Sequence, residues 1–227
     1  IQGAGGVIIP PESYWPEIQR ICDDNDILLI SDEVITGFGR TGSWFGADHF
    51  GTKPDLMPIA KGLTSGYLPM GGVLVSDRVA NVLKTKGGDF NHGFTYSGHP
   101  VCAAVAVANL RILRDEKIIE YVHDEIGPYL QSQLRTLEDH PVIGEVRGIG
   151  MLGALELVAG KNPIKLFEDG DAVGNMARDL AIENGLVMRA VGSKMIIAPP
   201  LVMTKPEVDE LVQRVRATLD ALAAKVL

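Results

Sequence analysis

The chain has 227 residues, of which 46% are hydrophobic and 6% aromatic, and its formal net charge at pH 7 is −8. This length suffices for one large domain or two modest ones, and the composition is that of an ordinary globular α/β protein. The acidic balance without a basic stripe argues against nucleic acid as a partner, and no run of 18 apolar residues predicts a membrane span.

The first residues, IQGAGGVIIPP, have none of the features of a secretory signal and do not include an initiating methionine. We therefore expect the chain to continue a longer polypeptide. Cys22 and Cys102 are the only cysteines and neither belongs to a C-x-x-C pair, so we interpret both as small buried hydrophobic residues. Their scarcity favours a reducing, cytoplasmic compartment.

In the first half of the chain, short apolar runs alternate with predicted helices. A helix is predicted over 14–25, and the unbroken apolar run 27–31 is typical of a strand covered on both faces. Residues 56–60 and 72–75 predict two further buried strands. This alternation predicts a mainly parallel α/β sheet, whose ligands bind beyond the carboxyl ends of the strands.

In the second half, an alanine-rich helix is predicted over 99–115, and a following helix should be kinked or broken by Pro128. Four strands and two helices are then predicted, with a capping box at Thr204-Lys205-Pro206-Glu207 opening the last helix. We place a domain boundary near residue 115, giving domains 1–115 and 116–227. The strands are expected at 142–147, 151–158, 186–189 and 195–198, the first helix at 171–183, and the buried face of the last helix at Val208, Leu211, Val215, Leu219 and Leu222.

An acid and an amine end two successive predicted strands. Asp32 follows the run ILLIS, and Lys61 follows LMPIA, 29 positions later. Each charge is costly in an apolar interior unless it has a partner. Together they fit a site in which a lysine forms a Schiff base with a pyridine aldehyde and an acid keeps the pyridine nitrogen protonated.

Structural alternatives exist for both groups. Asp32 could pair with Arg40 or cap a turn, and Lys61 could form a buried ion pair. We expect Lys61 to lie in an apolar pocket, where burial favours its neutral, nucleophilic form. Because successive strand residues face opposite sides, Glu33 is assigned a structural role, while Val34 returns to the side of Asp32 and could press against a ring.

The segment GFGRTG (37–42) matches G-x-G-x-x-G, a pattern found at dinucleotide sites. The carboxylates of Asp32 and Glu33 would repel a pyrophosphate, and no long helix is predicted directly after Gly42. We therefore interpret the segment as a tight loop that lets the chain pass close to a ligand.

Two other segments carry candidate binding residues. In NHGFTYSGHP (91–100), the Thr95 hydroxyl and the backbone amides suit a phosphate, although a simple loop and helix cap is the alternative. His92 and His99 lack the spacing of metal ligands, and no metal site is predicted. Arg189 ends a predicted strand; it is either solvated or suited to a bidentate contact with a carboxylate.

Taken in order, these segments resemble the class III aminotransferases, which use pyridoxal 5′-phosphate (PLP) and have fold type I. The closest likeness is to the ω-amino acid or diamine:pyruvate transaminases. The resemblance runs from Ile1 to the C-terminus and implies part of the large PLP domain followed by a smaller C-terminal α+β domain. It is carried by IQGAGGVIIPP, SDEVITGFGRTG, DLMPIAKGLTSGYLPMGG, FNHGFTYSGHP, VRGIGM and GLVMRAVG with IIAPPLVMT.

The resemblance implies a role for each matching residue. Lys61 is similar to the lysine that binds the cofactor aldehyde and moves the proton, Asp32 to the partner of the pyridine nitrogen, and Val34 to the residue packed on the ring. Phe94 and Thr95 resemble phosphate contacts given to the neighbouring subunit, which implies a homodimer with shared active sites. Arg189 resembles the mobile arginine that pairs with a substrate carboxylate.

The implied reaction moves an amino group from an ω-amino acid, diamine or primary amine to pyruvate. A PLP aminomutase or decarboxylase of the same fold, and a non-catalytic remnant, are the alternatives. The resemblance covers only the second half of a family chain, so we expect the N-terminal half on a separate chain or in an unrepresented segment. Without it, the sheet should have an exposed edge and the site should be incomplete.

Overall fold

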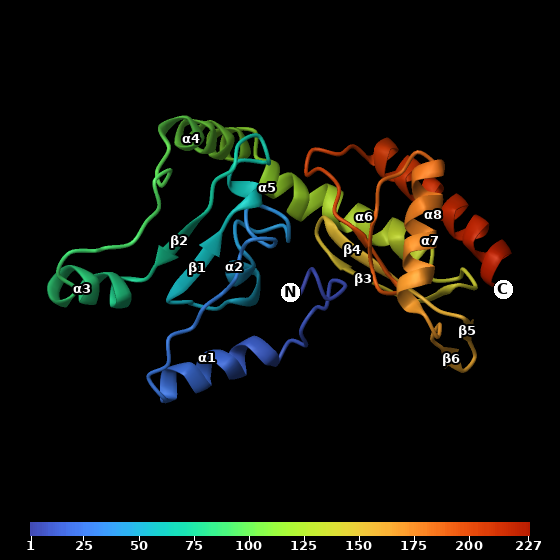
Figure 1. Cartoon of the computed structure of the whole chain (residues 1–227), viewed down its shortest axis with the longest axis horizontal. Helices are drawn as coiled ribbons and strands as arrows, with labels where there is room; N and C mark the ends of the chain where they lie inside the picture. Colours follow the sequence, from blue (N-terminus) through green and yellow to red (C-terminus); the bar gives the residue numbers. More distant parts are fainter. The chain divides into compact units, whose positions relative to one another are not determined.

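The computed structural model describes residues 1–227, which form two compact units (Figure 1). One unit comprises Pro10–Glu120, and the other comprises Ile1–Ile9 together with Tyr121–Leu227. The first nine residues therefore belong to the same unit as the C-terminal half. The division into family domains at residue 115 stays a prediction.

The Pro10–Glu120 unit is built around a short paired layer. Helix α1 (Tyr14–Asp24) precedes an extended segment that bridges in parallel from Ile30 to Leu56 in strand β1 (Leu56–Ile59). The backbone amides of Ser31 and Glu33 donate to the carbonyls of Leu56 and Pro58, each at 3.0 Å. Strand β2 (Gly72–Val75) then pairs with β1 in the antiparallel direction. The predicted strand at 27–31 is thus an extended parallel neighbour of β1 with a single bridge.

The paired layer is more exposed than its apolar sequence predicts. Ile30 is 59% exposed, and the side chains of β2 are exposed along the whole strand. The prediction of burial was wrong for β2 and for Ile30, whereas β1 is half-buried and its Ile59 is buried. An apolar run without alternation needs cover on both faces, and the residues of this chain leave those faces open to solvent.

Four further helical segments complete this unit: α2 (Gly46–Phe50), the 3₁₀ turn η1 (Lys61–Leu63), α3 (Asp77–Lys86) and α4 (Pro100–Asp115). Helix α4 confirms the predicted alanine-rich helix, whereas α2 and α3 were not predicted. Pro at N1 suits the start of α4, because this position needs no backbone N–H donor.

The predicted interruption at Pro128 is confirmed as a change of helix geometry. Helix α5 (Ile118–Tyr121) continues through a π-helical segment, η2 (Val122–Ile126), into α6 (Gly127–Arg135). The amide of Gly127 reaches back five residues to the carbonyl of Val122. A π turn next to Pro128 lets the chain continue although proline has no N–H and its ring crowds the preceding turn.

The other unit contains a four-stranded antiparallel sheet with the strand order β3-β4-β8-β7. A short hairpin, β5–β6, follows β4, and helices α6, α7 and α8 lie along the sheet (Figure 1). The strands are β3 (Ile143–Ile149), β4 (Leu152–Leu157), β5 (Gly160–Lys161), β6 (Ile164–Lys165), β7 (Arg189–Val191) and β8 (Lys194–Ile197), and the helices are α7 (Gly170–Glu183) and α8 (Lys205–Val226). Strand β7 begins three residues later than predicted.

Helix α8 follows its sequence pattern closely. The Thr204 amide donates to Glu207 at 2.7 Å, and the reciprocal cap contact is present, which confirms the capping box. These hydrogen bonds from Thr204 hold the pKa of Glu207 below its usual range. All five residues predicted to be buried on α8 are buried, and they join one hydrophobic core with Leu130, Leu134, Leu155, Leu157 and Met195.

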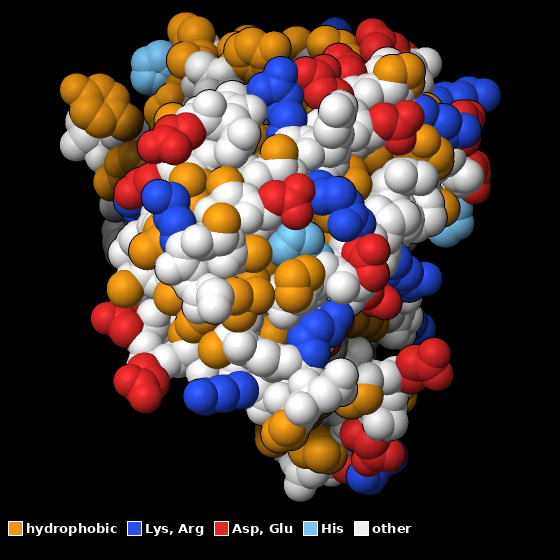
Figure 2. Space-filling model, turned by 90° about the vertical axis from the view of Figure 1, so that its right-hand side faces the viewer, with side chains coloured by type: hydrophobic (Ala, Val, Ile, Leu, Met, Phe, Trp, Pro, Cys, Tyr) orange, Lys and Arg blue, Asp and Glu red, His pale blue; other side chains and the backbone are white.

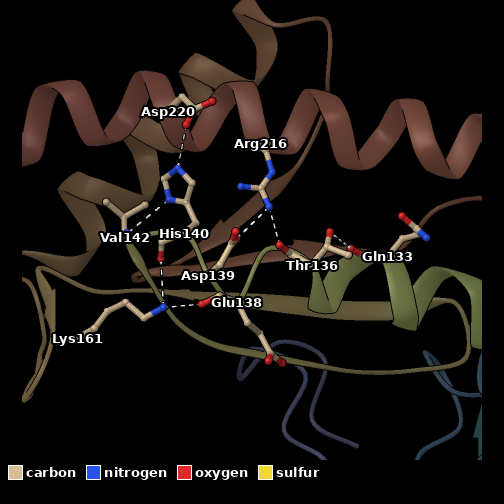
Figure 3. Close-up of polar contacts among 9 residues, drawn as sticks. All are labelled: Gln133, Thr136, Glu138, Asp139, His140, Val142, Lys161, Arg216 and Asp220. Carbon is tan, nitrogen blue, oxygen red and sulfur yellow. Dashed lines mark hydrogen bonds and ion pairs between the residues drawn. The ribbon is translucent and has the colours of Figure 1, made fainter.

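A group of polar contacts connects α8 and the β5–β6 hairpin to the turns after α6 (Figure 3). Arg216 donates to the carbonyl of Thr136 and pairs with Asp139 at 3.0 Å, which lowers the pKa of that carboxyl. Lys161 donates to the carbonyls of Glu138 and His140. These contacts tie the turns that follow α6 to α8 and to the β5–β6 hairpin.

Acidic and basic side chains are interspersed over the face shown in Figure 2. Arg178 and Asp179 on α7 form an exposed pair at 2.8 Å. Exposed pairs of this kind contribute little to stability. None of the helices combines the length and the apolar character that a membrane crossing requires.

Candidate active site

Asp32 lies where the extended segment leaves β1. Its side chain is exposed, and its Oδ1 accepts a hydrogen bond from the Val34 amide at 3.0 Å. Oδ2 has no hydrogen-bond donor within the chain, and Asp32 forms no ion pair with Arg40. The carboxylate therefore caps its own turn with one oxygen and presents the other to solvent.

Glu33 points the opposite way and is 1% exposed. Its two oxygens accept hydrogen bonds from the Ser31 and Thr36 hydroxyls and from the amides of Gly46, at 2.8 Å, and Ala47, at 2.7 Å. Four donors on one buried carboxylate compensate for its loss of hydration. Glu33 thus holds the loop after Asp32 against the start of α2, in agreement with the structural role predicted for it.

The segment 37–42 is a compact, mostly buried turn, which confirms the prediction of a tight loop. Gly39 and Gly42 have φ of 93° and 85°, and Phe38, buried at 3% exposure, has φ of 61°. The amide of Phe38 donates to the Trp44 carbonyl. Burial lowers the pKa of Arg40 in the same turn to about 10.

Lys61 begins the η1 turn directly after β1, with a left-handed φ of 41°. A non-glycine residue in this region is uncommon and is held there by its surroundings. The Thr64 amide donates to the Lys61 carbonyl at 3.2 Å. We expected Lys61 to be enclosed by apolar residues, but in this chain its side chain is exposed and forms no ion pair. The end of β1 is therefore open to solvent in this chain.

The structure brings Asp32 and Lys61 to the same edge of the paired layer. The extended segment and β1 run in parallel through the Ser31–Leu56 and Glu33–Pro58 hydrogen bonds, so their carboxyl ends lie side by side. Both side chains are exposed there and neither is engaged by a charge of this chain. Val34, half-buried, is on the Asp32 side of the same edge.

Asn109 on α4 was not singled out from the sequence. Its side-chain amide donates to the carbonyls of Gly62 at 2.8 Å and Leu63 at 3.1 Å, and its oxygen accepts from the Ser65 hydroxyl at 2.8 Å. The one signal in the sequence was an asparagine inside an otherwise alanine- and valine-rich helix, where asparagine is unfavourable.

Phe94 and Thr95 lie in the exposed loop between α3 and α4 (Figure 1). Phe94 is 75% exposed. Its backbone amide closes a tight turn by donating to the Ser97 hydroxyl at 2.9 Å. The Thr95 hydroxyl is exposed and has no hydrogen-bond partner in the chain. The predicted helix cap is also present, because the His99 ring accepts from the Val101 amide.

Arg189 is the first residue of β7, an edge strand of the antiparallel sheet. Its backbone pairs with Ile196, and its guanidinium is exposed without an ion pair. It belongs to a different compact unit from Asp32 and Lys61. The structure contains no cluster of three or more His, Cys, Asp or Glu side chains placed to hold a metal.

The fold and these residues define a class of protein. Residues 1–219 match the family model of the class-III aminotransferases, and the chain belongs to this family. Its fold is PLP fold type I, and the family uses pyridoxal 5′-phosphate.

Among individual relatives, the chain is similar to a putrescine–pyruvate aminotransferase of Pseudomonas aeruginosa, with 60% identity over all of this chain and 49% of the relative. A diaminobutyrate–2-oxoglutarate transaminase of Halomonas elongata is 46% identical over 94% of this chain and 47% of its own length. The chain thus spans about half the length of the curated relatives it matches.

Solved structures show the same likeness. An (S)-enantioselective omega-transaminase from Thermomicrobium roseum superimposes with a TM-score of 0.93 at 44% identity, covering 98% of this chain and 49% of that one. The omega-transaminase of Pseudomonas jessenii in complex with PMP gives a TM-score of 0.92 at 41% identity, covering 99% and 50%.

The chemistry of the donor set fits PLP. Asp32 has one carboxylate oxygen free to accept a hydrogen bond from a protonated pyridine nitrogen, and Lys61 has a free amine on the neighbouring chain segment. The exposed Thr95 hydroxyl can donate to a phosphate oxygen. An acid for the ring nitrogen, an amine for the aldehyde and a donor for the phosphate are the groups that this cofactor requires.

Proposed function

We propose that the complete protein to which this chain contributes is a PLP-dependent aminotransferase. It would move an amino group from an ω-amino acid, a diamine or another primary amine to pyruvate. The observation that carries the proposal is that Asp32 and Lys61 lie at the same sheet edge. One carboxylate oxygen of Asp32 has no hydrogen-bond partner, and the Lys61 amine forms no ion pair. The names of the relatives favour amino transfer over isomerisation or decarboxylation.

Each site residue has a role that follows from its position. When bound, PLP would supply an electron sink for the chemistry at the substrate carbon. Asp32 keeps a proton on the ring nitrogen, because a nearby anion stabilises the protonated form. Lys61 would hold the cofactor through its aldehyde and, once the substrate amine has displaced it, its free amine could carry the proton to and from the substrate. Val34 would pack against the ring.

The remaining residues bind the phosphate and the substrate. Thr95 and Phe94 lie on an exposed loop, which suits contacts to the cofactor of a second copy in a homodimer with shared active sites. Arg189 is an exposed guanidinium without an ion pair, free to form a bidentate contact with a substrate carboxylate. Pyruvate as the acceptor is supported by the 60% identical putrescine–pyruvate aminotransferase.

The chain needs additional residues to complete the site. The open faces of β2 and the exposed Lys61 support a missing N-terminal half, on a separate chain or in an unrepresented segment, that covers them. The half-length match to the relatives agrees with this. Both cysteines are free thiols, and free thiols are typical of reducing compartments. On this ground alone we propose a cytoplasmic location.

The decisive test is Lys61→Ala in the complete enzyme, assayed with putrescine, cadaverine, β-alanine and an arylalkylamine as donors and pyruvate as acceptor. We expect turnover to be abolished with every donor, because no other group of the site can bind the aldehyde. Lys84→Ala, on the exposed face of α3, is the matched control and should keep full activity. Near-normal turnover by the Lys61 variant would reject the proposal.

A further inference from the structure

The turn that carries Lys61 is held from α4 by one side chain. Asn109 uses both amide hydrogens on the carbonyls of Gly62 and Leu63 and its oxygen on the Ser65 hydroxyl. The orientation of the amide follows from this network, since a flipped amide would place its oxygen against two carbonyl oxygens. Three hydrogen bonds from one residue thus span the four residues that follow Lys61.

The backbone that Asn109 holds is one that would otherwise relax. Lys61 and Ser65 have left-handed φ angles of 41° and 50°, and neither residue is glycine. Such conformations persist only where the surrounding structure imposes them. Leu63 and Thr64 are buried, and the Thr64 hydroxyl donates to the Leu68 carbonyl at 2.6 Å, whereas Lys61, Ser65 and Tyr67 are exposed.

We propose that Asn109 is a positioning residue, whose side-chain amide holds the 61–65 turn so that the Lys61 amine is presented at the sheet edge beside Asp32. This inference rests on the role proposed above for Lys61. Asn109 does not touch the cofactor or the substrate; it acts through the carbonyls of the turn. Small misplacement of a reacting group costs a large factor in rate.

The test compares Asn109→Asp and Asn109→Ala with the unsubstituted parent, all three made as the complete enzyme. Aspartate keeps the shape and the acceptor for Ser65 but loses both donors to the carbonyls. Asn81→Asp is the matched control, because Asn81 is exposed on α3 and its side chain forms no hydrogen bond. It makes the same change of charge within the same unit.

Two readouts report on the turn without relying on enzymatic turnover. Amide hydrogen exchange of Leu63, Thr64 and Tyr67 should accelerate about tenfold in both Asn109 variants, since each of these hydrogen bonds has its donor or its acceptor in the turn. Treatment with PLP and borohydride, followed by peptide mapping, should show about tenfold less label at Lys61 and unchanged label at Lys84. The Asn81 variant should match the parent in both measurements.

In the complete enzyme, the Asn109 variants should lose about 10- to 100-fold in kcat with little change in KM, as expected for lost alignment rather than lost binding. Absence of label at Lys61 in the complete enzyme, with its native residue at position 109, would refute the proposed function itself. Label at Lys61 in the parent with equal label in Asn109→Asp would overturn the positioning role alone. If either Asn109 variant fails to fold, Ser65→Ala replaces it, because this change removes only the hydrogen bond to the Asn109 oxygen. Ser65→Ala must then reduce the label at Lys61 by about twofold or more. Labelling equal to that of the parent would again overturn the inference.

Discussion

The side chain of Phe38 occupies the space that a side chain at position 62 would need. A β-carbon added to Gly62 would lie 2.9 Å from the Cβ of Phe38, closer than such atoms approach one another. Phe38 belongs to the loop after Asp32, and Gly62 directly follows Lys61. This contact therefore joins the two turns that carry the candidate catalytic groups.

Gly62→Ala should force these two turns apart. Because Phe38 is buried and has little room to move, we expect the free energy of unfolding to fall by about 1–3 kcal/mol. Gly72→Ala is the control, since its added β-carbon would meet Ile59 only at an ordinary 3.7 Å. Denaturant titration of both variants checks the prediction, which is contradicted if they are equally stable.

Glu33→Gln, which replaces one carboxylate oxygen with an NH₂ group, should strongly destabilise the Pro10–Glu120 unit. The new NH₂ group faces hydroxyl and amide donors in place of an oxygen that accepts from them, so we expect a loss of about 2–4 kcal/mol. Glu17→Gln, an exposed carboxylate paired with Arg20, should change stability by less than about 0.5 kcal/mol. Thermal unfolding compares the two, and a small effect at Glu33 would show that its four hydrogen bonds are replaceable.

Glu156 should make the Ile1–Ile9 and Tyr121–Leu227 unit sensitive to acid. Burial acts to raise the pKa of Glu156, but the hydrogen bond from Arg147 at 2.8 Å and the charge of Lys194 outweigh it and keep the pKa below its usual 4.5. A carboxyl with a depressed folded pKa contributes stability above its unfolded pKa and loses this contribution as the pH falls through the folded value.

We therefore expect the Tm of the parent protein to fall between about pH 5 and pH 3. Glu156→Gln should have a lower Tm at pH 7 and a shallower fall over this range, because the variant has no proton to bind. Tm measured against pH for both proteins checks this. Identical slopes would mean that the Arg147–Glu156 pair contributes nothing to the acid sensitivity.

Arg189→Ala should separate substrates by their charge. In the complete enzyme we expect KM for pyruvate and for carboxylate-bearing donors to rise about tenfold or more, because a bidentate contact to the carboxylate is lost. Putrescine, which has no carboxylate, should be affected much less in its own half-reaction. Equal losses for both kinds of substrate would remove the carboxylate-binding role of Arg189. Arg178→Ala, an exposed arginine on α7, serves as the control.

Local patterns in the sequence predicted the elements that depend on local forces. The capping box at Thr204, the buried face of α8 and the alanine-rich helix α4 follow from hydrogen bonds and side-chain spacing within a few residues. The misplaced strand at 186–189 shows the limit of such patterns. Val187 is apolar but 88% exposed, because the sheet pairs only from Arg189 onward.

The sequence by itself determined which chemical groups end the strands, because an acid and a lysine after two apolar runs are visible without any folding. Tertiary structure decided what holds those groups. Asn109 meets the Lys61 turn across 46 and 47 positions of chain, and Phe38 meets Gly62 through packing that no local pattern encodes. It also decided that Lys61 is exposed here, since burial depends on which other residues cover a strand and not on the strand's own composition.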